Sequence, residues 1–193
     1  MTDRLVLLDL CSGSGAWSRP YLEAGWDVHY VDLPGNDVLT YMPPPIVHGI
    51  LAAPPCDQFS LARTRASKPR NLPAALEIVK ACYRIIWECR LRTEHFAENP
   101  LMFWALENPF GLLRQFLGIP PLTFYAYEYG DNWKKRTDVF GYFNIPPKTP
   151  LSLLPGTLDL SKVSGASGTS DQKAKARSVT PPGFSLRFYQ ANH

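Results

Sequence analysis

Residues 4–18, RLVLLDLCSGSGAWS, decide the fold class of this chain. An apolar run ends at Asp9 and leads into Gly13 and Gly15, which is typical of a buried strand, a tight turn and a helix start. Glycines let the backbone turn sharply and approach a ligand at the helix N-terminus. A second predicted strand, WDVHYVDL at 26–33, places Asp32 where it can accept ribose hydroxyl groups. We expect a nucleoside-containing cofactor here; the alternative is a glycine turn that serves packing alone.

Strands and helices alternate along the rest of the chain. Apolar runs predict further strands at 48–53, 101–107, 123–129 and 138–143. Helices are predicted at about 20–25, 73–92 and 184–192, the second of them from apolar residues at helical spacing. This alternation predicts an α/β fold with a mostly parallel sheet, whose ligands lie beyond the carboxyl ends of the strands. The Leu-, Pro-, Ser- and Gly-rich segment 151–176 is expected to be a mobile loop within one catalytic domain.

Composition narrows the class of protein. The chain has 193 residues, 45% of them hydrophobic and 19% charged, which is the balance of one soluble domain with a full-sized core. Charges near the N-terminus and the lack of a long apolar run argue against a signal peptide and a membrane span, so we expect a cytoplasmic protein. A net charge of +3 permits a nucleic-acid partner without demonstrating one. No CxxC pair, HxH or HExxH spacing occurs, so no metal is expected.

Cys56 is the candidate nucleophile. It follows a predicted buried strand in APPCDQFS, where two prolines stiffen the approach and hold the thiol in one place. A structural cysteine would be expected within an apolar period, as Cys82 and Cys89 are on the long predicted helix. Cys56 instead lies in a polar turn, where amides or a cation could stabilise a thiolate. The alternative is a small buried hydrophobic side chain.

Glu107 is the candidate acid. It closes the predicted strand in WALENP, so its carboxyl group is expected at the same sheet edge as Cys56. A partly desolvated carboxyl group there can be protonated near neutral pH and donate to a ring nitrogen. The alternative is a cap of a helix or loop.

A basic turn precedes the last predicted strand. The segment 130–137, GDNWKKRT, places three cations beside an aromatic residue, which suits a phosphate backbone or a polarised carbonyl. The alternative is a solvated turn between two strands.

In order, the segments DLCSGSG, PPCDQFS, WALENP, YGDNWKKRT and RSVTPPGFSLRFYQAN resemble the C5-cytosine DNA methyltransferases, especially short phage and prophage members. The resemblance extends from residue 9 to about residue 192. It implies a Rossmann-like methyltransferase fold with helices on both faces of the sheet, and S-adenosyl-L-methionine as the methyl donor. It also implies a bacterial or phage-infected cell as the location.

The resemblance assigns roles to individual residues. The Cys56 thiolate would add to C6 of cytosine, Glu107 would bind and protonate N3, and Arg136 would hold the base oxygen. A target base within a duplex would have to be flipped out. The implied cofactor-binding residues are Asp9, Cys11, Ser12, Gly13, Gly15, Trp17, Asp32, Asp37 and Pro54.

Three departures from the family pattern bear on the site and the substrate, besides ENP in place of the commoner ENV and Asp57 in place of a usual Gln. The family usually has Phe at the position of Cys11, which leaves Trp17 as a possible aromatic contact to adenine. Only Arg136 matches the two arginines of the family motif, and Asp138 stands where the second is expected. The interval between Arg136 and Thr180 is too short for the target-recognition domain of typical members.

A chain without that domain is expected to read little sequence itself. It would act on short or loosely defined DNA sites, on single strands, RNA or free nucleotides, or with a specificity partner protein. A second interpretation is a methyltransferase-like nucleic-acid-binding protein without turnover.

Overall fold

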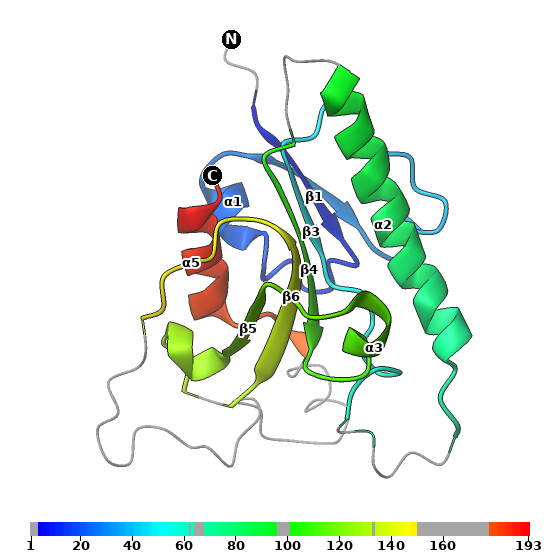
Figure 1. Cartoon of the computed structure of the whole chain (residues 1–193). Coiled ribbons are helices and arrows are strands. Elements are labelled where there is room, and N and C mark those ends of the chain that lie inside the picture. The colour runs from blue at the N-terminus through cyan, green and yellow to red at the C-terminus, as the bar shows by residue number, and fades with distance from the viewer. Residues whose placement is uncertain (1–3, 62, 64–67, 96–100, 133, 150–177) are drawn as a thin grey trace.

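The computed structural model describes residues 4–61, 63, 68–95, 101–132, 134–149 and 178–193. Its described strands form one six-stranded sheet in the order β2-β1-β3-β4-β6-β5 (Figure 1). The strands are β1 (Val6–Leu10), β2 (Asp27–Val31), β3 (Gly49–Ala52), β4 (Phe103–Pro109), β5 (Leu122–Tyr125) and β6 (Arg136–Tyr142). Each lies within or close to a predicted strand.

The sheet is mixed, which corrects the expected strand directions in part. Strands β2, β1, β3 and β4 pair in parallel, as predicted. Strand β6 lies between β4 and β5 and runs antiparallel to both. Antiparallel strands need no crossover helix, so the ten-residue connection between β5 and β6 can lead the chain straight back into the sheet.

The described helices cover both faces of the sheet (Figure 1). The long helix α2 (Leu72–His95) lies on one face, and α1 (Arg19–Glu23) and α5 (Pro182–Ala191) lie on the other. Side chains alternate along each strand, so Leu8 packs in the core beneath α2 and Leu7 in the core beneath α1 and α5. The sheet is therefore buried on both faces, which agrees with the apolar runs of β1, β3 and β4.

Two local elements differ from the predictions. The expected strand 123–129 is divided, because β5 ends at Tyr125 and a 3-10 helix, η1 (Ala126–Tyr129), follows. Glu128 accepts a hydrogen bond from the Tyr125 backbone N–H in a capping box, which stops the strand at that point. A short helix, α3 (Arg114–Leu117), was not predicted. The expected loop 151–176 lies outside the described residues.

Among the described helices, none combines the length and apolar character needed to cross a membrane.

Candidate active site

The turn between β1 and α1 has the backbone that its glycines predict. Cys11, Gly13 and Gly15 have φ angles of 56°, 54° and 65°, in the left-handed region that favours glycine. The Gly13 N–H donates to Asp32 Oδ2 at 2.8 Å, which joins the turn to the end of β2. A Cβ on Gly15 would lie 3.0 Å from the ring of Tyr30, so this glycine also permits close packing. The two sequence signals, the glycine turn and the acidic strand end, are in direct contact.

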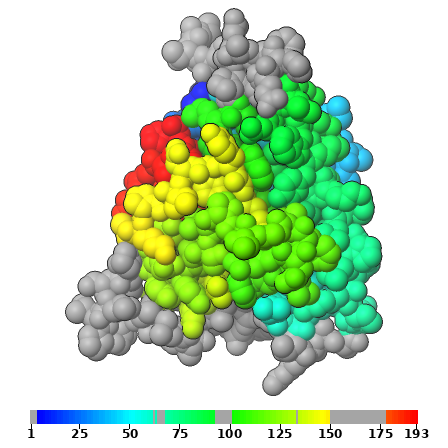
Figure 2. Space-filling model, in the orientation of Figure 1, coloured from blue at the N-terminus to red at the C-terminus, as the bar shows by residue number. Residues whose placement is uncertain are grey.

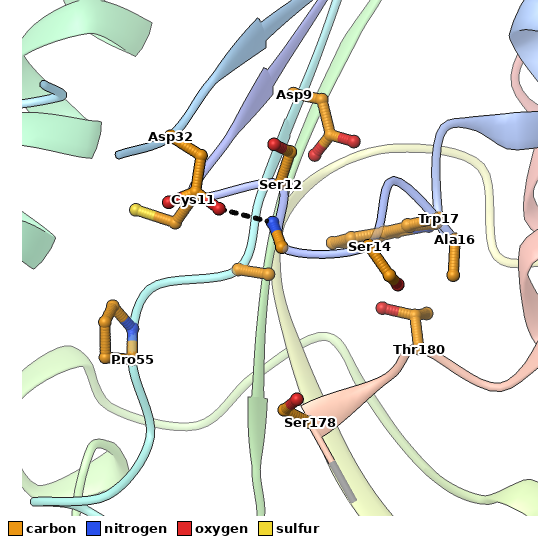
Figure 3. A pocket seen from close by; sticks show the side chains of 12 residues that line it. Asp9, Cys11, Ser12, Ser14, Ala16, Trp17, Asp32, Pro55, Ser178 and Thr180 are labelled. Atoms are coloured by element: carbon orange, nitrogen blue, oxygen red, sulfur yellow. Dashed lines mark hydrogen bonds between the residues drawn. The ribbon is translucent and has the colours of Figure 1, made fainter. Parts of the chain in front are cut away.

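A cavity of about 270 Å³ lies against this turn (Figure 3). Six of the predicted cofactor-binding residues line it: Asp9, Cys11, Ser12, Gly13, Trp17 and Asp32. Thr180 and Ser178 line it from the segment that precedes α5, and they were not predicted because nothing in a lone Ser or Thr signals such a role. Gly15 and Pro54 are not among the lining residues, whereas Pro55 is.

A second cavity of about 160 Å³ adjoins the first. Both are lined by Cys11, Asp32 and Pro55, so the two volumes meet beside these residues. Asp37, which the resemblance assigns to cofactor binding, lines the second cavity. The other lining residues are mostly apolar: Val31, Leu33, Asn36, Val38, Leu39 and Ile78. The combined groove has a polar end at Asp9 and an apolar end between β2 and α2.

Asp9 is a buried acid at the polar end of this groove. Its carboxylate accepts a hydrogen bond from Ser18 Oγ at 2.5 Å, and only 1% of the residue is exposed. Burial raises the pKa of Asp9 to about 7, and the nearby Asp32 charge adds to the rise while the Ser18 hydrogen bond opposes it. A cation bound in the groove would favour the charged form of Asp9, so the site suits a ligand with a positive group.

Replacing Asp9 by asparagine should change how stability depends on pH. The folded protein keeps the Asp9 proton to about pH 7, whereas the ordinary pKa is 3.8. The folded state therefore binds more protons than the unfolded state in this window, and wild-type stability falls as pH rises through it. When the pH is raised from 5 to 7, the free energy of unfolding of Asp9→Asn should increase by about 2 kcal/mol relative to that of wild type. Urea unfolding at several pH values measures this; a pH-independent difference would contradict it.

Cys56 lies in the loop that follows β3. Its carbonyl accepts the N–H groups of Phe59 and Ser60 at 3.0 and 2.8 Å, which folds the loop into a tight turn. Arg70, just before α2, donates to the carbonyl oxygens of Gln58 and Ser60 and holds this turn in place. The loop is therefore fixed by hydrogen bonds on the C-terminal side of Cys56.

The electrostatic surroundings of Cys56 involve Glu107 and Lys135. Burial raises the pKa of the Cys56 thiol, the Glu107 carboxylate raises it further and Lys135 lowers it. The thiol is therefore protonated at neutral pH in the free protein. The predicted stabilisation of a thiolate by a cation is present, through Lys135, but burial outweighs it.

Glu107 and Lys135 form a buried ion pair. Lys135 Nζ lies 3.2 Å from Glu107 Oε1, and each side chain is only 5% exposed. Lys135 also donates to the Val179 carbonyl at 3.2 Å. Glu107 Oε1 is buried and accepts no hydrogen bond from the described residues. Its close contact with Lys135 is an ion pair only. An acidic side chain with unused bonding capacity therefore lies near the thiol.

Asn108 joins the APPCDQFS segment, which contains Cys56, to the WALENP segment, which contains Glu107. Its side-chain N–H donates to the Pro54 carbonyl at 3.0 Å, so the loop of Cys56 and the end of β4 are joined directly. Gly111 reinforces the junction, because a Cβ there would lie 2.4 Å from the Phe59 carbonyl oxygen. Pro54 thus helps to build the site through its backbone, beside the cavity that Pro55 lines.

Arg136 has a different position from Lys135. Arg136 is exposed and its guanidinium carbon lies 3.7 Å from the ring centroid of Phe110. The cation paired with Glu107 is thus Lys135, which sequence reasoning did not single out from its two basic neighbours. Asp138, at the place expected for a second arginine, accepts hydrogen bonds from Arg114 at 2.5 and 2.7 Å. The role of Arg136 at the base oxygen stays a prediction.

Removal of Lys135 should be costly because it leaves Glu107 buried without its cation. Lys135→Met should lower the free energy of unfolding by about 3 kcal/mol or more. The double variant Lys135→Met/Glu107→Gln should recover most of this loss. The matched control is Lys148→Met, which breaks the more exposed pair with Glu128 and should cost about 1 kcal/mol or less. Urea unfolding tests all three; a double variant no more stable than the single one would contradict the argument.

Comparisons with known proteins give a distant likeness to solved structures. No protein-family model matches the chain, and no curated protein matches it. Among solved structures the chain is similar to a methyltransferase of Entamoeba histolytica, EhMeth, with 9% sequence identity and a TM-score of 0.40. The match covers 73% of this chain and 53% of that one, so the chain spans about half the length of the relative. The functional argument therefore rests on the geometry of the site.

Proposed function

We propose that this chain is an S-adenosylmethionine-dependent methyltransferase that methylates C5 of cytosine in DNA. The proposal rests mainly on one observation: Cys56, Glu107 and Lys135 lie together next to the groove at the β1–α1 turn. Pro55 lines both cavities of that groove and directly precedes Cys56. A nucleophilic thiol, an acid and a methyl-donor groove are the parts that this reaction needs.

The groove suits S-adenosylmethionine in its chemistry. Its polar end offers the Asp9 carboxyl group to a cationic ligand, and the indole Nε1 of Trp17, which also lines the cavity, is buried without a hydrogen-bond partner. Asp32 lies where the two cavities meet and can accept ribose hydroxyl groups with its free lone pairs. The apolar end, near Val38 and Leu39, suits a flat adenine ring. When bound, the cofactor supplies an electrophilic methyl group.

In the proposed reaction Cys56 first forms a covalent bond to the base. The thiol loses its proton to water and the sulfur adds to C6, breaking the C5–C6 double bond. The Glu107 carboxylate, which is paired with Lys135 in the free protein, takes up a proton from solvent as the base binds and donates it to N3, so the electron pair displaced from the ring is not left as a full negative charge. C5 is thereby made nucleophilic enough to accept a methyl group. Loss of the C5 proton to water, departure of the Cys56 sulfur as thiolate and return of the N3 proton to Glu107 then restore the C5–C6 double bond.

Lys135 has two functions in this scheme. Its positive charge lowers the pKa of the Cys56 thiol, which favours the attacking thiolate. It also lies against Glu107, where it compensates the carboxylate once the acid has given up its proton. Lys135 is thus assigned the position close to the base that the sequence assigned to Arg136.

The base must leave a duplex to reach this site. Glu107 is only 4% exposed, so its carboxyl group can meet N3 of a cytosine only after the base has been flipped out or is already unpaired. We infer that DNA is the substrate, and that a specificity partner protein supplies sequence recognition where it is needed.

The test is transfer of labelled methyl from S-adenosylmethionine to duplex DNA, single-stranded DNA, RNA and dCMP. We expect label at C5 of cytosine in DNA. Label on RNA or dCMP alone would change the substrate. No label on any substrate, with folded protein that binds the cofactor, would overturn the proposal and favour a non-catalytic nucleic-acid-binding protein.

A further inference from the structure

A cluster of aromatic and basic side chains lies on the sheet face that carries α3. We call it the aromatic–basic face and define it by Phe110, Tyr125, Tyr127, Lys134 and Arg136. Figure 2 shows this side of the molecule, where α3, β5, η1 and β6 form the surface. The three rings are half-buried and the two cations are exposed. None of these residues belongs to the two buried hydrophobic clusters that form the core. Packing of the core therefore does not explain why they lie together.

The rings and cations lie one after another in space. Arg136 lies over Phe110, 3.7 Å from its centroid, and 5.7 Å from the centroid of Tyr125. Tyr125 and Tyr127 are stacked at 5.3 Å with an angle of 11° between their planes. Lys134 Nζ lies 5.7 Å from the same Tyr125 ring. Flat surfaces therefore follow one another across this face, and those of Phe110 and Tyr125 lie near positive charges.

The positive charge of this face is uncompensated. Within the described part of the chain, neither Lys134 nor Arg136 forms an ion pair. The acidic side chains nearby have other partners, since Asp138 pairs with Arg114 and Glu128 with Lys148. The face therefore complements an anionic partner.

The face adjoins the proposed active site through the backbone. Arg136 directly follows Lys135, and consecutive side chains of a strand point to opposite faces of a sheet. Phe110 lies three residues after Glu107, and its N–H donates to the Arg136 carbonyl at 3.0 Å. Lys135 and Glu107 are thus connected to Arg136 and Phe110 of the aromatic–basic face by one and three residues of chain.

We propose that the aromatic–basic face binds the unpaired nucleotides flanking the target cytosine, which makes single-stranded DNA the preferred substrate; this rests on the proposed function. Bases stack on aromatic rings and guanidinium planes without regard to sequence, and phosphates are attracted to the adjacent cations. In a duplex the flat surfaces of the bases are covered by their own neighbours, so this face has nothing to stack on. Sequence-tolerant binding also agrees with the expectation that the interval between Arg136 and Thr180 holds no recognition domain.

The test measures binding in the absence of cofactor, on wild type and on Cys56→Ser. The probe is a fluorescein-labelled DNA strand of about twelve nucleotides containing one cytosine, free or annealed to its complement. Fluorescence anisotropy gives the affinity of wild type, Tyr127→Leu and Arg136→Gln. The matched control is Lys80→Gln, which removes an exposed lysine of α2 that pairs with Glu77. Thermal melting establishes that each variant is folded.

We expect the single strand to bind more tightly than the duplex. Tyr127→Leu should weaken single-strand binding by about 5- to 100-fold. Arg136→Gln should weaken it as well and reduce its salt dependence by about one phosphate contact, whereas Lys80→Gln should bind as wild type does. Duplex binding as tight as single-strand binding, or wild-type affinity in both folded face variants, would overturn this inference even if methyl transfer is found. Face-dependent single-strand binding without methyl transfer would count against the proposed function alone.

Discussion

Cys56→Ser should abolish methyl transfer to cytosine. A serine hydroxyl is far less acidic than a thiol, and the buried surroundings that raise the pKa of Cys56 would oppose ionisation of a hydroxyl group too. No described side chain next to Cys56 offers a second thiol, because Cys82 and Cys89 are buried in the core beneath α2 and Cys11 lies at the groove. Transfer of labelled methyl to cytosine-containing DNA measures the effect.

Cofactor binding separates this loss from a loss of structure. Cys56 is not among the residues that line either cavity, so Cys56→Ser should bind S-adenosylmethionine with wild-type affinity in calorimetry. Cys89→Ala is the control for removal of a thiol, because Cys89 packs in the core beneath α2, and it should retain transfer. Full activity in Cys56→Ser would rule out the covalent mechanism.

Glu107→Gln should slow methyl transfer by about 10²- to 10⁴-fold. Glutamine can still hydrogen-bond to the base but cannot protonate N3, so the negative charge that forms on the ring after Cys56 adds is no longer neutralised. The variant keeps the size and shape of the buried side chain, and the loss should appear in kcat rather than in cofactor affinity. Single-turnover transfer to DNA measures it.

The same substitution should make Cys56 more reactive toward iodoacetamide. The Glu107 charge raises the pKa of the Cys56 thiol, so its removal lowers that pKa and increases the thiolate fraction at a fixed pH. Lys135→Met should do the reverse. Mass spectrometry of the labelled peptide distinguishes Cys56 from Cys11. If Glu107→Gln lost both transfer and thiol reactivity, a collapsed site would explain the result better than a missing acid.

Much of the fold follows from local sequence. The apolar run before Asp9, the left-handed turn at Gly13 and the apolar period of α2 each depend on neighbours in the chain, and the structure has all three. The contact between the glycine turn and Asp32 also follows, because neighbouring parallel strands end at one edge of the sheet. The same rule explains why Cys56, which follows β3, and Glu107, which lies near the end of β4, have an electrostatic interaction.

Other features depend on long-range pairing that no local pattern encodes. Strand β6 lies between β4, which is far from it in the sequence, and β5, after which the chain turns back. Its antiparallel pairing with both strands sets its direction. The division of the expected strand 123–129 depends on the Glu128 side chain capping Tyr125, a geometry that an alternating pattern does not reveal.

The choice between Lys135 and Arg136 shows this limit most directly. By itself the sequence determined the sheet of buried strands, the glycine turn and the positions of Cys56 and Glu107 at one edge. It could not determine which of two adjacent cations faces Glu107, because a shift of one residue along a strand moves every side chain to the opposite face. The pairing of Glu107 with Val139 sets that register, and Lys135, four residues before Val139, lies on the side of Glu107. Only the tertiary structure could therefore distinguish the buried ion pair at the proposed active site from the exposed guanidinium of the aromatic–basic face.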